Sequence, residues 1–142
     1  MMYNKKSTKR YTIMSKVRHA VLIDDDEATN VYHDIIVQEA DVVEEYQIFD
    51  SAVDALDFLK NQEHAPDFIL LDINMPRMTG WEFLEEYKKL DQAVNPPKII
   101  MLTTSLGTFD KKQAEENPLV SGFRQKPLTL EMLYEIAASI QK

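Results

Sequence analysis

The chain has 142 residues, a formal net charge of −8 at neutral pH and no cysteine. Its length suits one domain with a single core, and its 44% hydrophobic and 28% charged residues exclude a disordered protein. Disulfides and thiolate metal sites are excluded, the apolar runs are too short to span a membrane, and the acidic balance argues against general nucleic-acid binding. We therefore expect a globular, cytoplasmic protein without a membrane segment.

The first 18 residues differ in charge from the rest of the chain. They hold six basic residues and no acid, so the net charge of the remainder is −14. They lack the continuous apolar segment of a secretory signal. We expect residues 1–18 to form a disordered basic extension and residues 19–142 to form the domain. For residues 1–13 two interpretations stay open: a loose tail, or an extension upstream of a natural start at Met14.

Strand and helix signals alternate through the domain. Short runs of apolar, aromatic or β-branched residues predict strands at residues 21–23, 45–49, 68–71, 98–102 and 120–124. Apolar residues at helical spacing, together with capping residues, predict helices over 28–36, from Ser51 to Leu59, from Gly80 to Leu90, over 108–116 and from Thr129 to Ile140. Five such units indicate an α/β fold with a doubly wound, open parallel sheet, because a (β/α)8 barrel needs a longer chain.

Polar residues follow several of the predicted strands, at the sheet edge where open α/β proteins bind ligands. Close carboxylates repel one another, so this edge needs a positive charge nearby. Oxygen ligands with open positions for water and phosphate suit Mg²⁺ better than Ca²⁺. An ionised aspartate beside such an ion can attack phosphorus, while a lysine and a threonine bind the phosphoryl oxygens. The residues at this edge are Asp24, Asp25, Asp72, Thr103, Thr104 and Lys126.

The sequence resembles the receiver domains of two-component response regulators. Four stretches carry the resemblance, in the family's order and spacing: VLIDD, FILLDINMPRMTGWEFL, IIMLTTS and SGFRQKPLTLEML. The resemblance covers about residues 19–142. It implies a (βα)5 flavodoxin-like fold with strand order 2-1-3-4-5.

The resemblance also implies roles for the acidic residues. Asp72 would be the phosphoacceptor. Asp24 and Asp25 would be the acidic pair that organises Mg²⁺, with Asp72 and the main-chain carbonyl of Asn74 completing the protein ligands.

Further matching positions concern the phosphoryl group and the switch. Thr103 and Lys126 would contact the phosphoryl group, Phe123 would take the aromatic switch position, and the Lys126–Pro127 bond is a candidate for a cis peptide. Thr104 stands where the family usually has a smaller residue and would narrow access to the site. Phe123 lacks the hydroxyl of the frequent tyrosine, so switching would depend on ring packing.

These features predict a signalling protein that is not an enzyme in the ordinary sense. A histidine kinase or phosphotransfer protein would phosphorylate it, and output would pass to a downstream protein through the fourth helix, fifth strand and fifth helix. The chain ends soon after the fifth helix, so we expect no DNA-binding domain. Two alternatives are a Mg²⁺-dependent phosphatase or phosphotransferase acting on small molecules, and a pseudo-receiver that works without phosphorylation. Haloacid-dehalogenase-type phosphatases have a second Asp where this chain has Asn74.

Overall fold

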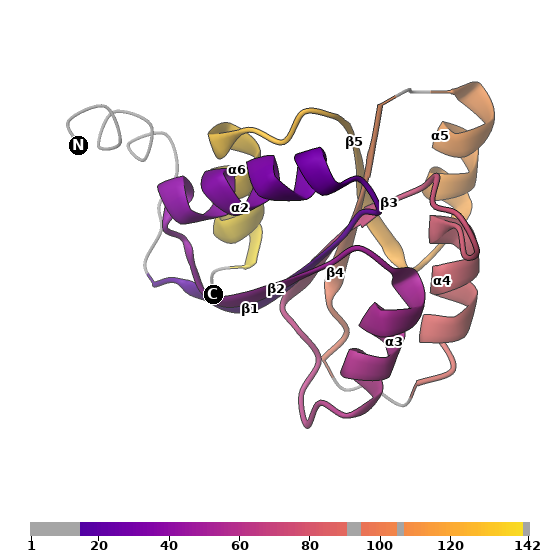
Figure 1. The fold of residues 1–142 in the computed structure, drawn as a ribbon, viewed down its shortest axis with the longest axis horizontal. Helices are drawn as coiled ribbons and strands as arrows, with labels where there is room; N and C mark the ends of the chain where they lie inside the picture. The colour runs from indigo at the N-terminus through magenta and orange to yellow at the C-terminus, as the bar shows by residue number, and fades with distance from the viewer. Residues whose placement is uncertain (1–14, 91–94, 105–106, 141–142) are drawn as a thin grey trace.

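Five parallel strands form one sheet in the computed structural model, which describes residues 15–90, 95–104 and 107–140 (Figure 1). Their order is β2-β1-β3-β4-β5, so the chain starts near the middle of the sheet and winds outwards in both directions. The predicted fold class and strand order are confirmed. The strands are β1 (Val17–Ile23), β2 (Val43–Phe49), β3 (Phe68–Asp72), β4 (Lys98–Thr103) and β5 (Val120–Gln125).

Helices cover both faces of the sheet (Figure 1). One face carries α2 (Glu27–Ala40) and α6 (Leu130–Ile140). The other carries α3 (Ala52–Lys60), α4 (Gly80–Tyr87) and α5 (Thr108–Glu116). This arrangement follows from right-handed crossovers, which send successive helices to opposite faces when the winding direction changes.

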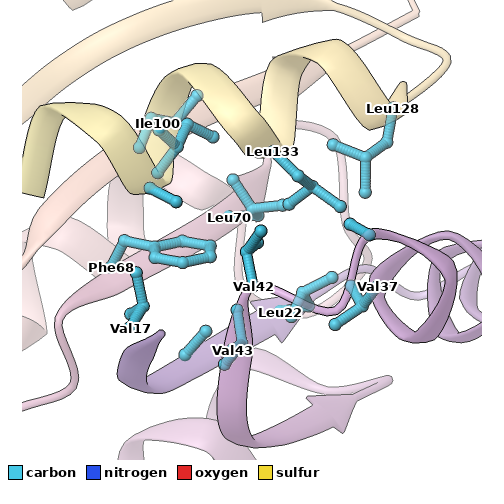
Figure 2. Close-up of a cluster of buried hydrophobic side chains, with 14 of the residues drawn as sticks. Val17, Leu22, Val37, Val42, Val43, Phe68, Leu70, Ile100, Leu128 and Leu133 are labelled. Atoms are coloured by element: carbon cyan, nitrogen blue, oxygen red, sulfur yellow. The ribbon is translucent and has the colours of Figure 1, made fainter. Parts of the chain in front are cut away.

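The core has two halves, one on each face of the sheet. In β1, Leu22 belongs to the half under α2 and α6, whereas its neighbours Val21 and Ile23 belong to the half under α3 and α4. Figure 2 shows the first half, where Phe68 and Leu70 from β3 lie close to Leu22 and to helix α6. Because both sides of the central strands are buried, these strands are continuously apolar instead of alternating.

Side-chain caps define where the helices begin. The Ser51 hydroxyl accepts a hydrogen bond from the Asp54 N–H (3.2 Å), and the Thr129 hydroxyl accepts one from the Met132 N–H (3.1 Å). Both caps agree with the sequence-based expectation, and a cap of this kind stabilises a helix by about 1 kcal/mol. The third helix, α4, is shorter than expected: it ends at Tyr87, whereas the sequence predicts a helix to Leu90.

The first helix turns a different face to the core than its apolar spacing suggests. Val31 and Ile35 are each 58% exposed, whereas His33, Val37 and Ala40 are buried. The hydrophobic periodicity of this helix therefore identifies its structure correctly but not the side that packs on the sheet.

The first strand, β1, begins at Val17, two residues before the expected domain boundary at residue 19. Val17 and Arg18 belong to β1, and Val17 is buried because it pairs with Val43 and packs in the core. The ammonium of Lys16 forms an ion pair with Asp41 at 2.7 Å. The rest of the predicted extension, residues 1–14, lies outside the described residues, and its disorder stays a prediction.

Candidate functional site

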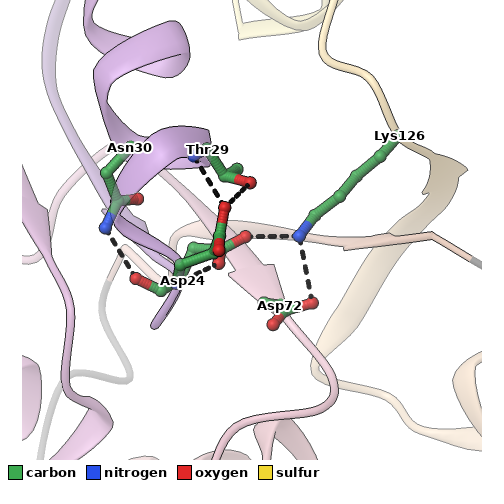
Figure 3. A network of polar contacts seen from close by, with 6 residues as sticks. Asp24, Thr29, Asn30, Asp72 and Lys126 are labelled. Atoms are coloured by element: carbon green, nitrogen blue, oxygen red, sulfur yellow. Dashed lines mark hydrogen bonds and ion pairs between the residues drawn. The ribbon is translucent and has the colours of Figure 1, made fainter.

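Four strands bring the predicted site residues to one edge of the sheet. Asp24 directly follows β1, Asp72 is the last residue of β3 and Thr103 is the last residue of β4. Lys126 follows β5 and reaches back across this edge (Figure 3). The carboxyl ends of parallel strands meet at the same edge, so the topology alone places these side chains together.

Lys126 connects the two buried carboxylates. Its Nζ lies 2.5 Å from Asp24 Oδ2 and 3.4 Å from Asp72 Oδ1 (Figure 3). The lysine side chain is 13% exposed, so it is largely withdrawn from water. The cation that the sequence requires beside the aspartates is thus present in the chain itself.

The acidic cluster carries more negative charge than Lys126 can balance. Asp24, Asp25 and Asp72 each offer an oxygen, and these three oxygens lie within 4.8 Å of one another. Asp24 and Asp72 are only 2% and 7% exposed, whereas Asp25 is exposed. Three carboxylates against one ammonium, with oxygen as the donor atom throughout, fit a hard divalent cation such as Mg²⁺.

Backbone and helix contacts fix Asp24. Its Oδ1 accepts a hydrogen bond from the Asp26 N–H at 2.9 Å, while its Oδ2 is the atom that contacts Lys126. The Asn30 side-chain amide donates to the Asp24 main-chain carbonyl at 2.7 Å (Figure 3). Each carboxylate oxygen of Asp24 therefore already has one partner within the protein.

Asp26, the third aspartate of the run, has a separate task. It is the N-cap of α2, and its carboxylate accepts hydrogen bonds from the hydroxyl (2.6 Å) and the N–H (2.8 Å) of Thr29. These hydrogen bonds lower the pKa of Asp26. The capping geometry orients the helix start that follows Asp24 and Asp25.

The environment of Asp72 favours its neutral form. Burial is the main cause and the nearby negative charge of Asp24 the second, and together they raise the pKa of Asp72 to about 6 although Lys126 acts in the opposite direction. Burial also acts to lower the pKa of Lys126, but its hydrogen bond to Asp24 and the charges of both aspartates outweigh burial and raise that pKa. At neutral pH, Asp72 is therefore ionised but poorly stabilised, and Lys126 is charged.

The remaining predicted residues lie around this centre. Thr103 is buried, and its main-chain carbonyl accepts a hydrogen bond from the Lys126 N–H at 2.6 Å. Thr104 is exposed next to it, and Asn74 is exposed two residues after Asp72. Phe123 is half-buried opposite Met101 of β4, on the side of the sheet covered by α4. The Lys126–Pro127 bond is cis, as the resemblance implies.

Two features of the site were not found from the sequence. Gly80 packs so tightly that a Cβ there would lie 2.5 Å from the main-chain oxygen of Asp72. His33 is buried in α2 and its pKa is lowered by burial, so the imidazole is neutral beside the acidic cluster. The Thr79-Gly80 pair at a helix start is a detectable signal for the first feature, whereas no local pattern distinguishes the second.

Comparison with known proteins identifies the family. The sequence profile described as "Response regulator receiver domain" matches residues 20–138. The chain belongs to the response regulator receiver domain family. The match spans the sheet and the strand-end site, so the resemblance in the four sequence stretches is confirmed.

Individual relatives agree with this assignment. The chain is 28% identical to the chemotaxis protein CheY of Halobacterium salinarum over 111 residues, which are 78% of this chain and 85% of that protein. The crystal structure of a two-component response regulator from Cytophaga hutchinsonii superposes with a TM-score of 0.79 at 31% identity, covering 88% of this chain and 97% of that one. The sensor histidine kinase CheAY of Helicobacter pylori is 32% identical over 83 residues, 58% of this chain, and the chain spans only 10% of that kinase.

Membership of the family defines the general role of the chain. Receiver domains are phosphoacceptors of two-component signalling rather than classical enzymes, and they bind Mg²⁺ at an acidic pocket. CheY-like receiver domains take phosphoryl groups from histidine kinases. Within the described ranges, no helix combines the length and apolar character needed to cross a bilayer.

Proposed function

We propose that this chain works as a response regulator receiver domain that accepts a phosphoryl group on Asp72 from a histidine kinase or a phosphotransfer protein. The observation that supports it most directly is the position of Asp72. This residue ends a central strand, its Oδ1 lies 3.4 Å from Lys126, and it shares an acidic cluster with Asp24 and Asp25. Asp24 is also buried and contacts Lys126, but one of its carboxylate oxygens accepts a hydrogen bond from the Asp26 N–H, and Asp25 is exposed.

The transfer follows from this arrangement. An ionised Asp72 oxygen attacks the phosphorus of a phosphohistidine, and the bond between phosphorus and the imidazole nitrogen breaks. The electron pair of that bond stays with the imidazole, which takes up a proton, and Asp72 becomes an acyl phosphate. Lys126 binds one of the phosphoryl oxygens, and a pKa of about 6 leaves Asp72 largely ionised at neutral pH.

The acidic residues divide the binding of Mg²⁺ among them. Asp25, Asp72 and the main-chain carbonyl of Asn74 would hold the ion directly. Asp24 would act mainly through water, since each of its carboxylate oxygens already has a partner, Lys126 for one and the Asp26 N–H for the other. Bound Mg²⁺ supplies positive charge that stabilises the phosphoryl oxygens during transfer.

Phosphorylation is read out through Thr103 and Phe123. The Thr103 hydroxyl donates to the new phosphoryl group, and its movement makes room beside β4 for the Phe123 ring on the neighbouring strand. The ring then changes the face formed by α5, β5 and α6, where a downstream protein binds. Phe123 already lines a surface pocket with Lys111 and Ala114 of α5, so its position bears directly on this face.

The first test is intact mass after incubation with acetyl phosphate and Mg²⁺. The parent gains one phosphoryl group, and Asp72→Asn gains none because the attacking carboxylate is gone. Asp26→Asn is the matched control: it removes a neighbouring charge while an asparagine still caps α2, and it should be labelled like the parent. Labelling that persists in Asp72→Asn would disprove the assignment of Asp72.

A second arm tests the metal site by titration with Mg²⁺. Asp25→Ala should weaken binding by about tenfold or more, since it removes a direct ligand. Asp26→Asn should bind Mg²⁺ nearly as tightly as the parent. Undiminished affinity in Asp25→Ala would contradict the proposed ligand set.

A further inference from the structure

One side-chain hydrogen bond joins α4, the helix that follows β3, to α5, which forms part of the proposed binding face for a downstream protein. The indole Nε1–H of Trp81 in α4 donates to Oδ1 of Asp110 in α5 at 3.2 Å. Both residues lie in the first turns of their helices, and Figure 1 shows α4 and α5 on the same side of the sheet. Trp81 is half-buried and packs against the same half of the core as Phe123. The bond therefore connects two elements that the chain itself links only through β4.

The Trp81 end of this bond is held firmly. The preceding residue, Gly80, donates its N–H to the Ile73 carbonyl at 2.8 Å, and a Cβ at this position would lie 2.5 Å from the main-chain oxygen of Asp72. Thr79 and Glu82 form a reciprocal capping box around the same turn. Trp81 thus has a fixed position relative to the phosphoacceptor.

The α5 end is held much less firmly. Ala114 is the buried residue among the described side chains of this helix, and its N-cap, Gly107, provides no side-chain capping bond. Within the described part of the chain, the Trp81–Asp110 bond is the side-chain hydrogen bond that ties this first turn to another element. Only six residues separate Thr103 from Asp110 in the sequence, and we take a displacement of Thr103 to act on this turn.

We propose that the Trp81–Asp110 hydrogen bond is a tether that restrains α5 in its unphosphorylated position. The inference rests on the proposed function, because it takes Thr103 to move toward a phosphoryl group on Asp72. That movement pulls the start of α5 while Trp81 stays fixed by Gly80, so the tether opposes it. By linkage, a contact that favours the unphosphorylated arrangement weakens binding of the phosphoryl group, and removing the contact strengthens it.

The tether is first tested without any ligand, by amide hydrogen exchange. Trp81→Phe keeps an aromatic ring but removes the N–H, and Asp110→Ala removes the acceptor. Each should speed exchange of the Lys111 amide, whose N–H donates to the Gly107 carbonyl in the first turn at 2.9 Å, by about fivefold. Asp110→Asn retains an acceptor oxygen and should stay close to the parent. Unchanged exchange in both Trp81→Phe and Asp110→Ala would overturn the proposal.

The coupling to the site is tested with beryllofluoride and Mg²⁺, which stand in for the phosphoryl group. Trp81→Phe and Asp110→Ala should each bind beryllofluoride about fivefold more tightly than the parent, equivalent to about 1 kcal/mol, and the double variant should gain no more than either alone. Equal or weaker binding in the single variants would refute the restraining role. A parent that fails to bind beryllofluoride would instead refute the proposed function, and the exchange experiment would still decide whether the tether exists.

Discussion

Asp72 has the least favourable environment of the acidic residues in the site. Its carboxylate is buried and close to Asp24, and Lys126 compensates for only part of the resulting charge. An ionised group in such a place destabilises the folded chain, and the proposed function would use the same group as a nucleophile and a metal ligand. The functional arrangement of this residue should therefore be visible as a loss of stability in the metal-free protein.

Asp72→Asn should stabilise the metal-free protein at neutral pH. The unfolded chain releases the Asp72 proton near pH 3.8 and the folded chain near 6, so the parent loses stability as the pH rises between these values. The asparagine variant has no such proton. Its free energy of unfolding should equal that of the parent below about pH 4 and exceed it by roughly 3 kcal/mol above pH 6. Urea unfolding with a chelator at both ends of this range measures it.

Asp26→Asn is the control, because its effect on stability at neutral pH should have the opposite sign to that of Asp72→Asn. Its hydrogen bonds with Thr29 lower the pKa of Asp26, so the ionised carboxylate stabilises the folded chain, and this contribution is lost as the pH falls through the folded pKa. The variant should be slightly less stable than the parent at neutral pH. If Asp72→Asn gains the same stability at both ends of the pH range, the buried charge is not the cause.

At the scale of elements, the close contact of α4 with β3 controls the backbone geometry behind Asp72. Gly80 begins α4 and leaves no room for a side chain, because a Cβ would meet the Asp72 oxygen at 2.5 Å and the Ile73 Cα at 3.0 Å. Both neighbours are backbone atoms, so neither can turn away as a flexible side chain could. The packing of this helix is thus transmitted directly to the strand end that carries Asp72.

Gly80→Ala should therefore destabilise the protein by about 1–3 kcal/mol, as overpacking usually does, and should slow phosphorylation of Asp72. Gly122→Ala in β5 is the matched control, since the nearest atom to its Cβ would be Ile100 Cγ1 at an ordinary 3.6 Å. Chemical denaturation and intact mass after acetyl phosphate treatment measure both effects. Equal stability of the two variants would show that α4 can shift away from β3 without loss.

At the scale of the whole molecule, β1 begins within the basic N-terminal segment of the sequence. β1 is an interior strand that pairs with both β2 and β3, and Val17 is its first residue. Val17 is buried in the core half under α2 and α6 (Figure 2). The basic composition of residues 1–18 therefore extends across a structural boundary.

Deletion of residues 1–13 should leave the melting temperature and the phosphorylation rate unchanged, because this segment has no apolar periodicity with which to join the core. Deletion of residues 1–17 should lower the melting temperature clearly, since it removes a buried valine worth about 1.5–3 kcal/mol and the first pairing of β1 with Val43. Thermal unfolding of both truncated proteins measures the difference. A large loss on deletion of 1–13 alone would show that the extension is structural.

The sequence by itself determined the parallel sheet and the set of strand-end residues. Apolar runs and helical spacing are local properties, and a parallel α/β topology brings Asp24, Asp72 and Lys126 to one edge whatever the details of packing. The resemblance of four stretches then sufficed to assign the family and to name the expected cis peptide at Lys126–Pro127. The expected direct role of Asp25 and the carbonyl of Asn74 in Mg²⁺ binding stays a prediction.

Only the tertiary structure decided which contacts form between parts of the chain that are distant in sequence. It buried His33 and exposed Val31 and Ile35, because the orientation of α2 depends on α6 and the sheet beneath it and not on the helix's own periodicity. The two carboxylate oxygens of Asp24 contact Lys126 and the Asp26 N–H, and Trp81 donates a hydrogen bond to Asp110. Local patterns specify elements and their ends, whereas such pairings depend on how helices and strands pack together, which no single segment encodes.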